Sequence, residues 1–359
     1  MSDTEMIAES LDRWFIDHMS PEILDNAEKG GWAEDLWVGL EEHGYMRLLL
    51  SEENGGTGGG WADAYALLYV AAFHCAPLPI AETLVANNVL AQAGLPVKDG
   101  VSTIVQQPDD DSLDIREDGS YLVLHGTVQR VPWASHASRI VVAGRLGEKP
   151  VVAVVPTDAD GLQISASTSI ASEPLDSVVF ERCRCTEFVL VPTSSADAPV
   201  LIQGALARAV QMSGLLESVL RQTVCHVKDR QQFGRPLMSM QAVKQSLAVL
   251  AANSVAADVA VRAACDAGDS AISRFDVAVA KIQTGKAAAI GARIAHQLHG
   301  AMGFTYEHPL HHATRRLWSW RTDFGNDAYW AKEIGRKAAM RGGAAFWPDL
   351  TARRMIGQG

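Results

Sequence analysis

Hydrophobic residues recur at three- and four-residue intervals through the first hundred residues and again from about residue 197 onward. This spacing is typical of amphipathic helices. Two of the later runs, 206–220 and 243–250, predict long helices separated by a break at Phe233-Gly234. Pro236 stands where a new helix would begin, because proline is tolerated in a first helical turn. From Gln241 we expect the second helix to follow.

Between residues 101 and 196 the pattern changes to short β-branched runs separated by turn residues. Asp118-Gly119 is a hairpin signal within this stretch. The even spacing predicts a small antiparallel β-domain. We therefore expect a mostly helical α+β fold with an N-terminal helical domain (1–100), a middle β-domain (101–196) and a C-terminal helical bundle (197–359). Alanines between residues 275 and 299 permit close packing in a four-helix bundle.

Composition restricts the function more than the fold. A net charge of −11 argues against a nucleic-acid partner, which requires a basic face. No apolar run of about 18 residues predicts a membrane span. No signal-peptide pattern opens the sequence, so we expect a cytoplasmic protein. Five scattered cysteines predict neither a disulfide framework nor a zinc site.

The break between the two long helices carries the first candidate chemistry. Arg230, Phe233 and Gly234 together offer a guanidinium, an aromatic ring and a flexible backbone. A guanidinium binds a pyrophosphate bidentately, and an aromatic ring packs on another ring. The stretch therefore suits a planar, anionic cofactor. From spacing alone, a surface helix end with a solvated arginine is the favoured interpretation.

Three motifs in this chain resemble those of the acyl-CoA dehydrogenase family. Arg230-x-x-Phe233-Gly234 followed by Gln241 is similar to its R-x-x-F-G motif. The stretch 297–309 is similar to Q-x-x-G-G-x-G-[FY]-x-x-E-x-P, and the stretch 50–56 resembles P-E-E-Y-G-G. The resemblance implies the family's fold, in which a helical domain, a small antiparallel β-domain and a four-helix bundle follow one another.

The resemblance also implies a cofactor and a reaction. Family members oxidise an acyl-CoA thioester between its α and β carbons: a Glu takes the α-proton and FAD takes a hydride from the β-carbon. Two chains assemble each FAD site, one holding the flavin ring and its neighbour reaching across to the ADP half. The residues that the resemblance assigns to the reaching chain are Arg230, Gln232, Phe233, Gly234, Gln241, Gln297, Gly300 and Ala301. Ala301 replaces the second glycine of the family's G-G pair.

The flavin-holding half of the family pattern is missing. The flavin loop T-E-P-x-A-G-S-D is replaced by the stretch 106–111, which ends in three acidic residues. Arg130 stands at the position of a flavin-stacking Trp, and Pro132 at that of a ring-contacting Thr. The two positions where family members carry the base hold Phe324 and Gly204, and neither side chain can remove a proton. We therefore predict no catalytic residue in this chain.

One half-site kept and the other lost resembles the degenerate smaller (β) subunit of heteromeric α2β2 acyl-CoA dehydrogenases that shorten steroid side chains. The partners so implied are a larger catalytic subunit, a bulky acyl-CoA substrate and an electron-transfer flavoprotein. Two alternatives stay open. One is a self-sufficient homotetrameric dehydrogenase with a relocated base, Asp323 or Glu217, and the other is a redox-inactive scaffold or acyl-CoA-binding protein.

Five histidines gather near the second motif. Imidazoles are good metal ligands, so a metal site there is one interpretation. The motif itself accounts for the stretch, which favours polar or interface histidines, and we predict no metal. These histidines are His296, His299, His308, His311 and His312.

Overall fold

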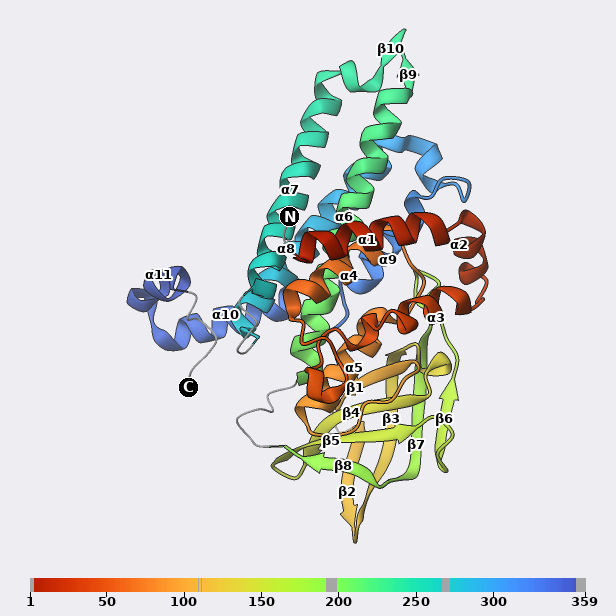
Figure 1. Ribbon diagram of the computed structural model, residues 1–359. Helices are drawn as coiled ribbons and strands as arrows, with labels where there is room; N and C mark the ends of the chain where they lie inside the picture. Colours follow the sequence, from red (N-terminus) through yellow and green to blue (C-terminus); the bar gives the residue numbers. More distant parts are fainter. Residues whose placement is uncertain (1–2, 109, 111, 192–198, 267–271, 353–359) are drawn as a thin grey trace. The chain divides into compact units, whose positions relative to one another are not determined.

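The computed structural model describes residues 3–108, 110, 112–191, 199–266 and 272–352 (Figure 1). The chain forms two compact units, each built from separate stretches of sequence. The first comprises Met1–Met19, Trp61–Ala76 and Ala205–Gly359, and the second Ser20–Gly60 and Pro77–Gly204. The predicted α+β fold is confirmed.

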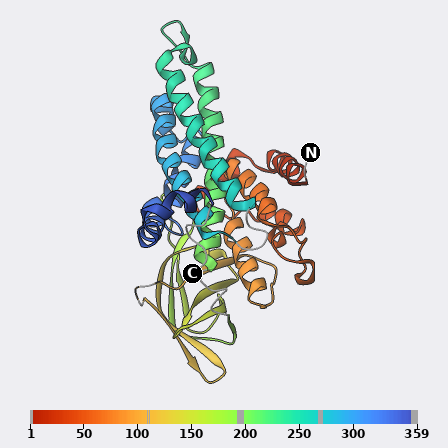
Figure 2. The ribbon, with the colours of Figure 1, turned by 90° about the vertical axis from the view of Figure 1, so that its left-hand side faces the viewer.

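The first unit is a bundle of helices. Its N-terminal helices are α1 (Asp3–His18) and α4 (Trp61–Phe73), and most of the long α6 (Pro199–Asp229) belongs to it. The remaining helices are α7 (Gln241–Asp266), α8 (Arg274–His299), α9 (Leu310–Trp320), α10 (Asp327–Arg341) and α11 (Gly343–Thr351), with 3-10 turns η5 (Leu237–Ser239) and η7 (Gly300–Phe304). Figure 2 shows α6 and α7 running side by side up to a short hairpin, with α8 beside them.

Small residues allow the bundle helices to approach closely. A Cβ added to Gly214 on α6 would lie 2.2 Å from the backbone oxygen of Tyr69 on α4. A Cβ added to Gly291 on α8 would lie 3.0 Å from a methyl of Leu216 and 3.1 Å from a methyl of Leu250. The close packing expected from the alanine-rich stretch is therefore confirmed, and glycine shares the role with alanine.

The outer face of α7 is apolar and uncovered in this chain. The inner face of α7 is buried in the bundle through Leu247, Leu250, Ala257 and Val261. Three valines on its outer side are 47–60% exposed. These are Val249, Val255 and Val259. Because it is apolar on more than one face, α7 is long and apolar enough, by length and composition, to cross a membrane, although core helices of soluble proteins pass the same test.

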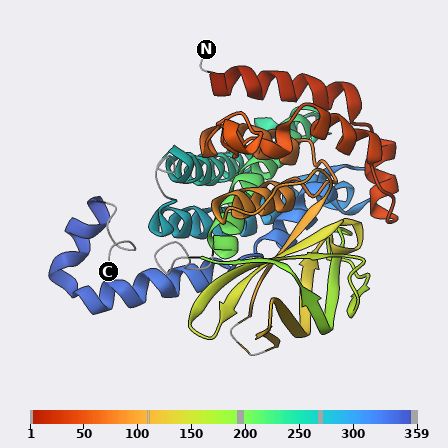
Figure 3. The same ribbon diagram turned by 60° about the horizontal axis from the view of Figure 1, so that its bottom comes forward.

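The second unit combines short helices with two four-stranded sheets. Its helices are α2 (Pro21–Glu28), α3 (Glu34–Glu42) and α5 (Ile80–Gln92), with 3-10 turns η1 (Tyr45–Arg47), η2 (Glu52–Asn54) and η3 (Ala134–His136). One sheet has the order β1-β4-β5-β8 and the other β2-β3-β7-β6 (Figure 3). The strands are β1 (Ser102–Gln106), β2 (Leu113–Asp118), β3 (Tyr121–Pro132), β4 (Arg139–Leu146), β5 (Lys149–Pro156), β6 (Leu162–Ser165), β7 (Leu175–Cys185) and β8 (Glu187–Leu190).

The β-core forms from alternating inward-facing residues of both sheets. Leu122, Leu124 and Val128 of β3 alternate with more exposed neighbours and pack with Val142 and Phe180 of other strands. The hairpin expected at Asp118-Gly119 joins β2 to β3. One detail differs from the antiparallel expectation, because β1 and β4 pair in parallel. The chain reaches β4 only after passing through the other sheet, so the two strands enter their sheet from the same end.

Among the described residues, the five cysteines form no disulfide. Cys183 and Cys185 lie two residues apart on β7, and both are buried. Burial raises the pKa of both thiols, which keeps them protonated.

Candidate functional site

The first candidate motif forms a tight hairpin that projects beyond α6 and α7. Strands β9 (Gln231–Gln232) and β10 (Arg235–Pro236) pair across a two-residue turn, Phe233-Gly234. Both turn residues have positive φ, 55° and 71°, as this class of tight hairpin requires. The amide of Leu237 donates to the carbonyl of Arg230 at 2.9 Å and closes the loop.

The prediction that the second long helix runs from Gln241 is confirmed, but Pro236 does not open it. Pro236 is paired in β10, a 3-10 turn follows it, and α7 begins at Gln241. The helical run before it ends at Asp229 and not at Phe233. Proline lacks an N–H, so it fits an exposed edge strand as well as a first helical turn.

All of the hairpin residues that the family motif assigns to a cofactor face solvent in this chain. Arg230, Gln232, Gly234 and Gln241 are exposed. The side chain of Phe233 is 89% exposed although it is large and apolar. An exposed aromatic ring on a strained turn indicates a contact surface.

The second candidate motif lies where α8 ends. Gln297 is on the last turn of α8, and Gly300 and Ala301 open η7. All three are exposed. Gly300 has φ 60° and ψ −139°, a conformation that favours glycine, and it turns the chain away from the helix axis.

Two histidines bring the motifs together. His226 lies one helical turn before Arg230 on α6, and His299 lies between Gln297 and Gly300. Their rings stack with centroids 4.3 Å apart and an interplanar angle of 25°. The two motifs, separated by more than sixty residues of sequence, therefore adjoin in one unit. The sequence pattern gave no signal for His226, because nothing in its own stretch distinguishes it.

Burial governs the charge of this histidine group. It lowers the pKa of His299 to about 4, and it lowers the pKa of His226 and of His308. Arg230 lowers the pKa of His226 further by charge repulsion. The three imidazoles are therefore neutral at pH 7.

Several β-domain residues differ from the family's flavin-binding motifs, and local contacts hold them in place. Gln107 accepts from the amide of Arg145 at 2.7 Å and donates to the carbonyl of Leu113 at 2.8 Å. Arg130 has φ 61° and lies in a register shift between β3 and β7, where a bulge re-aims its exposed side chain. The hydroxyl of Thr103 donates to the carbonyl of Pro132. The acidic residues Asp109 and Asp111 lie outside the described residues.

The two positions at which the resemblance places the family's base hold side chains without acid–base chemistry. Phe324 is partly buried with φ 52°, and its carbonyl accepts from the indole N–H of Trp330 at 3.1 Å. Gly204 lies buried near the start of α6. Neither position provides a group that can accept the α-proton of a thioester.

Both carboxylates considered as relocated bases are engaged in ion pairs. Arg208 Nε lies 3.2 Å from Asp323 Oδ2, and the side chain of Arg208 is 4% exposed. Arg221 Nε lies 2.7 Å from Glu217 Oε1 within α6. Each of the two carboxylates is therefore held by an arginine side chain.

A buried lysine supports the segment around Asp323. Lys281 on α8 is 1% exposed, and its ammonium donates to the carbonyl of Asp323 at 2.8 Å. Burial lowers the pKa of Lys281 to about 8, and Asp323 opposes that shift. The buried ammonium of Lys281 therefore fixes the segment 323–324, at which the resemblance places the family's base.

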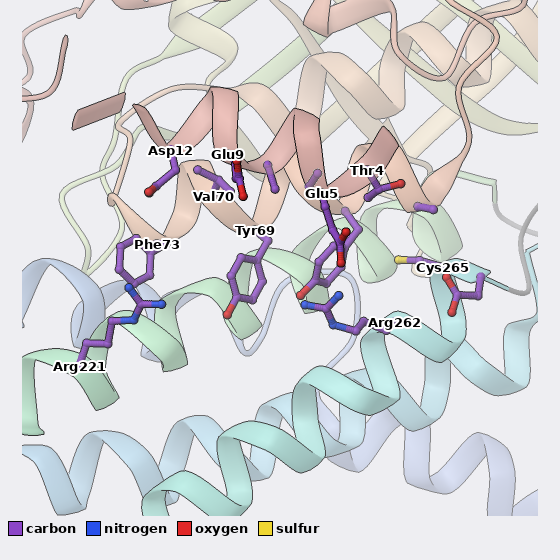
Figure 4. A pocket seen from close by; sticks show the side chains of 15 residues that line it. Thr4, Glu5, Glu9, Asp12, Tyr69, Val70, Phe73, Arg221, Arg262 and Cys265 are labelled. Carbon is purple, nitrogen blue, oxygen red and sulfur yellow. The ribbon is translucent and has the colours of Figure 1, made fainter. Parts of the chain in front are cut away.

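A pocket of about 570 Å³ lies elsewhere in the helical unit, among α1, α4, α6 and α7 (Figure 4). Tyr65 donates to Asp258 at 2.6 Å, and Arg262 pairs with the same carboxylate at 2.7 Å. Arg221 lies over the ring of Phe73, with its guanidinium carbon 4.9 Å from the centroid. None of the residues assigned by the family motifs lines this pocket.

Two family models match the chain. "Acyl-CoA dehydrogenase, N-terminal domain" covers residues 1–96 and "Acyl-CoA dehydrogenase, C-terminal domain" covers residues 199–339. The chain belongs to the acyl-CoA dehydrogenase family. Acyl-CoA dehydrogenases are FAD-dependent oxidoreductases that act on a CH–CH bond, and the resemblance read from the sequence motifs is confirmed.

Individual acyl-CoA dehydrogenases match over most of their length. The chain is 27% identical over 312 residues to acyl-CoA dehydrogenase IpdE2 of Mycobacterium tuberculosis, covering 86% of this chain and 89% of that protein. Its fold matches the ChsE4-ChsE5 complex from Mycobacterium tuberculosis with TM-score 0.87 and 21% identity, covering 94% of this chain and 98% of that chain. It also matches a variant of the Tcur3481-Tcur3483 steroid ACAD with TM-score 0.85 and 24% identity, covering 93% and 97%.

Proposed function

We propose that this chain is the non-catalytic subunit of a heteromeric, FAD-dependent acyl-CoA dehydrogenase. In this role it contacts the ADP half of an FAD whose flavin ring is held by a larger catalytic subunit. The single observation that carries the proposal is an asymmetry in the chain. Both ADP-side motifs are exposed and adjoin through the His226–His299 stack, whereas the two base positions hold Phe324 and Gly204.

The exposed motifs fit the chemistry of the ADP half. Arg230 offers two parallel N–H donors to a pyrophosphate, and no ion pair engages it within the described residues. Phe233 offers a ring face, and Gln232, Gln241 and Gln297 offer amide donors and acceptors. Gly234 and Gly300 allow the backbone to approach the phosphates closely, and Ala301 places a methyl group where the family has its second glycine. The bound FAD supplies the hydride-accepting flavin; this chain orients its nucleotide end.

The exposed apolar face of α7 supports an assembly of several chains. Val249, Val255 and Val259 would lose their contact with water against a neighbouring subunit. The structural neighbours include two-protein complexes, ChsE4-ChsE5 and Tcur3481-Tcur3483. We infer an α2β2 assembly with the catalytic chain as partner and an electron-transfer flavoprotein as the electron acceptor.

The same structural neighbours support a proposal for the class of substrate. The Tcur3481-Tcur3483 protein is described as a steroid ACAD. We infer that the assembled enzyme acts on a bulky acyl-CoA thioester whose acyl group is the side chain of a steroid. The catalytic partner supplies the base and the flavin pocket, and this chain leaves out both.

Co-expression tests the proposal. The chain is produced alone and together with a larger acyl-CoA dehydrogenase that carries the T-E-P-x-A-G-S-D loop and a Glu base. We expect the lone chain to be colourless and inactive, and the co-purified pair to be yellow and to dehydrogenate a steroid side-chain acyl-CoA. A yellow, active preparation of the lone chain contradicts the proposal. A partner complex without flavin favours the scaffold alternative.

A further inference from the structure

Three histidines from three different segments converge beside the candidate ADP site. His226 comes from α6, His299 from the end of α8 and His308 from the segment before α9. One ring nitrogen of each lies within 4.8 Å of one from each of the others. The ring of His299 stacks on His226 and meets His308 edge-on, with centroids 4.3 Å and 4.7 Å apart.

The tautomer of His299 leaves a lone pair directed into this group. Its Nδ1 lies 2.8 Å from the carbonyl oxygen of Ala295. A carbonyl only accepts, so Nδ1 carries the proton and Nε2 carries the lone pair. His299 is 4% exposed, and its Nε2 is buried without a hydrogen-bond partner among the described residues. A buried acceptor without a partner is unfavourable, so this atom requires a donor or a cation.

The arrangement of His299 is typical of a metal ligand. Metal-bound histidines usually donate the second ring N–H to a carbonyl or carboxylate, which fixes the ring and its tautomer. The lone pair of a neutral imidazole is the group that coordinates a metal. His226 and His308 are only partly buried, so an ion can enter from their side.

We propose that His226, His299 and His308 form a binding site for one divalent transition-metal ion of the zinc class. Imidazole nitrogen suits zinc, copper and nickel, and three histidines with one open position form a common tetrahedral set. The rings must close up to bring each nitrogen to about 2.0–2.1 Å from the ion. None of the three ligands is a carboxylate, so the site disfavours calcium and magnesium.

Two local features oppose binding and set its strength. His308 Nδ1 accepts from the amide of Leu310 at 3.1 Å, so the neutral ring carries its proton on Nε2. Coordination through Nε2 requires the other tautomer and the loss of that hydrogen bond. Arg230 repels a cation near His226, whereas Asp229 attracts one. Both features predict affinity below that of a preformed structural zinc site.

A bound ion would connect the two halves of the candidate ADP site. His226 precedes the Arg230 hairpin by one helical turn, and His299 lies within the stretch Gln297–Ala301. Coordination would therefore fix the end of α6 against the end of α8. The site depends only on residues of this chain, so it stands or fails independently of the proposed subunit role.

Metal titration of the full chain, freed of metal by a chelator, tests the site. Isothermal calorimetry with ZnCl2 should show one ion per chain, and Co2+ should give the visible absorption bands of a tetrahedral histidine site. His299→Gln should weaken Zn2+ binding by at least about 100-fold, because losing a ligand costs at least as much as losing its supporting residue. His125→Gln, an exposed histidine on β3, is the matched control and should bind as the wild type does.

A second variant guards against loss of the fold. His226→Gln removes a less buried ligand and should weaken binding to a similar extent, with an unchanged circular dichroism spectrum. The absence of saturable Zn2+ or Co2+ binding by the wild type overturns the proposal. Equal affinity in the wild type and both variants overturns it as well.

Discussion

Arg208 and Asp323 form an ion pair across the helical unit, with Nε 3.2 Å from Oδ2. Asp323 immediately precedes Phe324, which the motif resemblance places at the family's base position. Arg208 also donates to Gln211 at 2.7 Å, and its guanidinium carbon lies 4.9 Å from the centroid of Trp320. The carboxylate of Asp323 therefore has a structural partner, which supports a stabilising role for it.

Asp323→Asn should lower stability and leave the chemistry unchanged. Removing one partner of a buried ion pair typically costs about 3–5 kcal/mol. Chemical denaturation measures that loss, and turnover per bound FAD in the co-purified complex should stay within about threefold of wild type, less than the roughly 100-fold lost with a general base. Glu217→Gln, in an exposed pair, is the control and should change stability by less than about 1 kcal/mol. Loss of turnover per flavin in either variant would favour the relocated-base alternative.

Arg230→Ala should reduce the FAD content of the assembled complex. A charge-assisted hydrogen bond contributes about 1.5–3 kcal/mol, so FAD affinity should fall by about 10–100-fold. Flavin absorbance after gel filtration measures the effect. Arg235→Ala is the matched control because Arg235 lies in the same hairpin and is also exposed. Equal FAD retention in the two variants would contradict the assignment of Arg230.

Lys281 should make stability rise with pH above about 8. Its pKa is about 8 in the folded chain and 10.5 ordinarily, so between these values the unfolded chain binds more protons. Stability therefore increases with pH in that window, by about 1 kcal/mol between pH 8 and pH 9. Urea denaturation of the wild type and of Lys281→Met at both pH values measures the difference. A Met variant with the same pH dependence as the wild type would refute the assignment.

Gly214→Ala should destabilise the helical unit. The added methyl would lie 2.2 Å from the backbone oxygen of Tyr69, so α4 and α6 must separate. Overpacking of this kind costs about 1–3 kcal/mol. Gly335→Ala on α10, where nothing lies within 4 Å of the added Cβ, should be neutral or stabilising by up to about 1 kcal/mol. Thermal unfolding of both variants distinguishes local crowding from helix propensity.

The hydrophobic pattern predicted helices in the first hundred residues and strands between 101 and 196, and α4, α5 and the β2–β3 hairpin lie in those stretches. The hairpin around Phe233 was not predicted, because proline and glycine allow several turn geometries and only the positive φ of both turn residues distinguishes them. The parallel pairing of β1 with β4 was also missed. It depends on which sheet each strand joins, and that information is not local.

The candidate site was only partly accessible from the sequence. The two ADP-side motifs were identified from resemblance, and their cofactor contacts stay a prediction, as do the three domain boundaries. His226 was missed because its role depends on proximity to His299, which is 73 positions further along the chain. The arginine partners of Asp323 and Glu217 were likewise invisible until side chains from neighbouring turns and helices were placed together.

The uncovered valines of α7 have a consequence for the cell that makes this protein. A newly synthesised copy without a partner subunit exposes this apolar face to water. Such exposure favours aggregation and recognition by chaperones and proteases. Equal synthesis of the two chains would avoid this loss of protein. The lifetime of this polypeptide in the cell would therefore depend on the supply of its partner subunit.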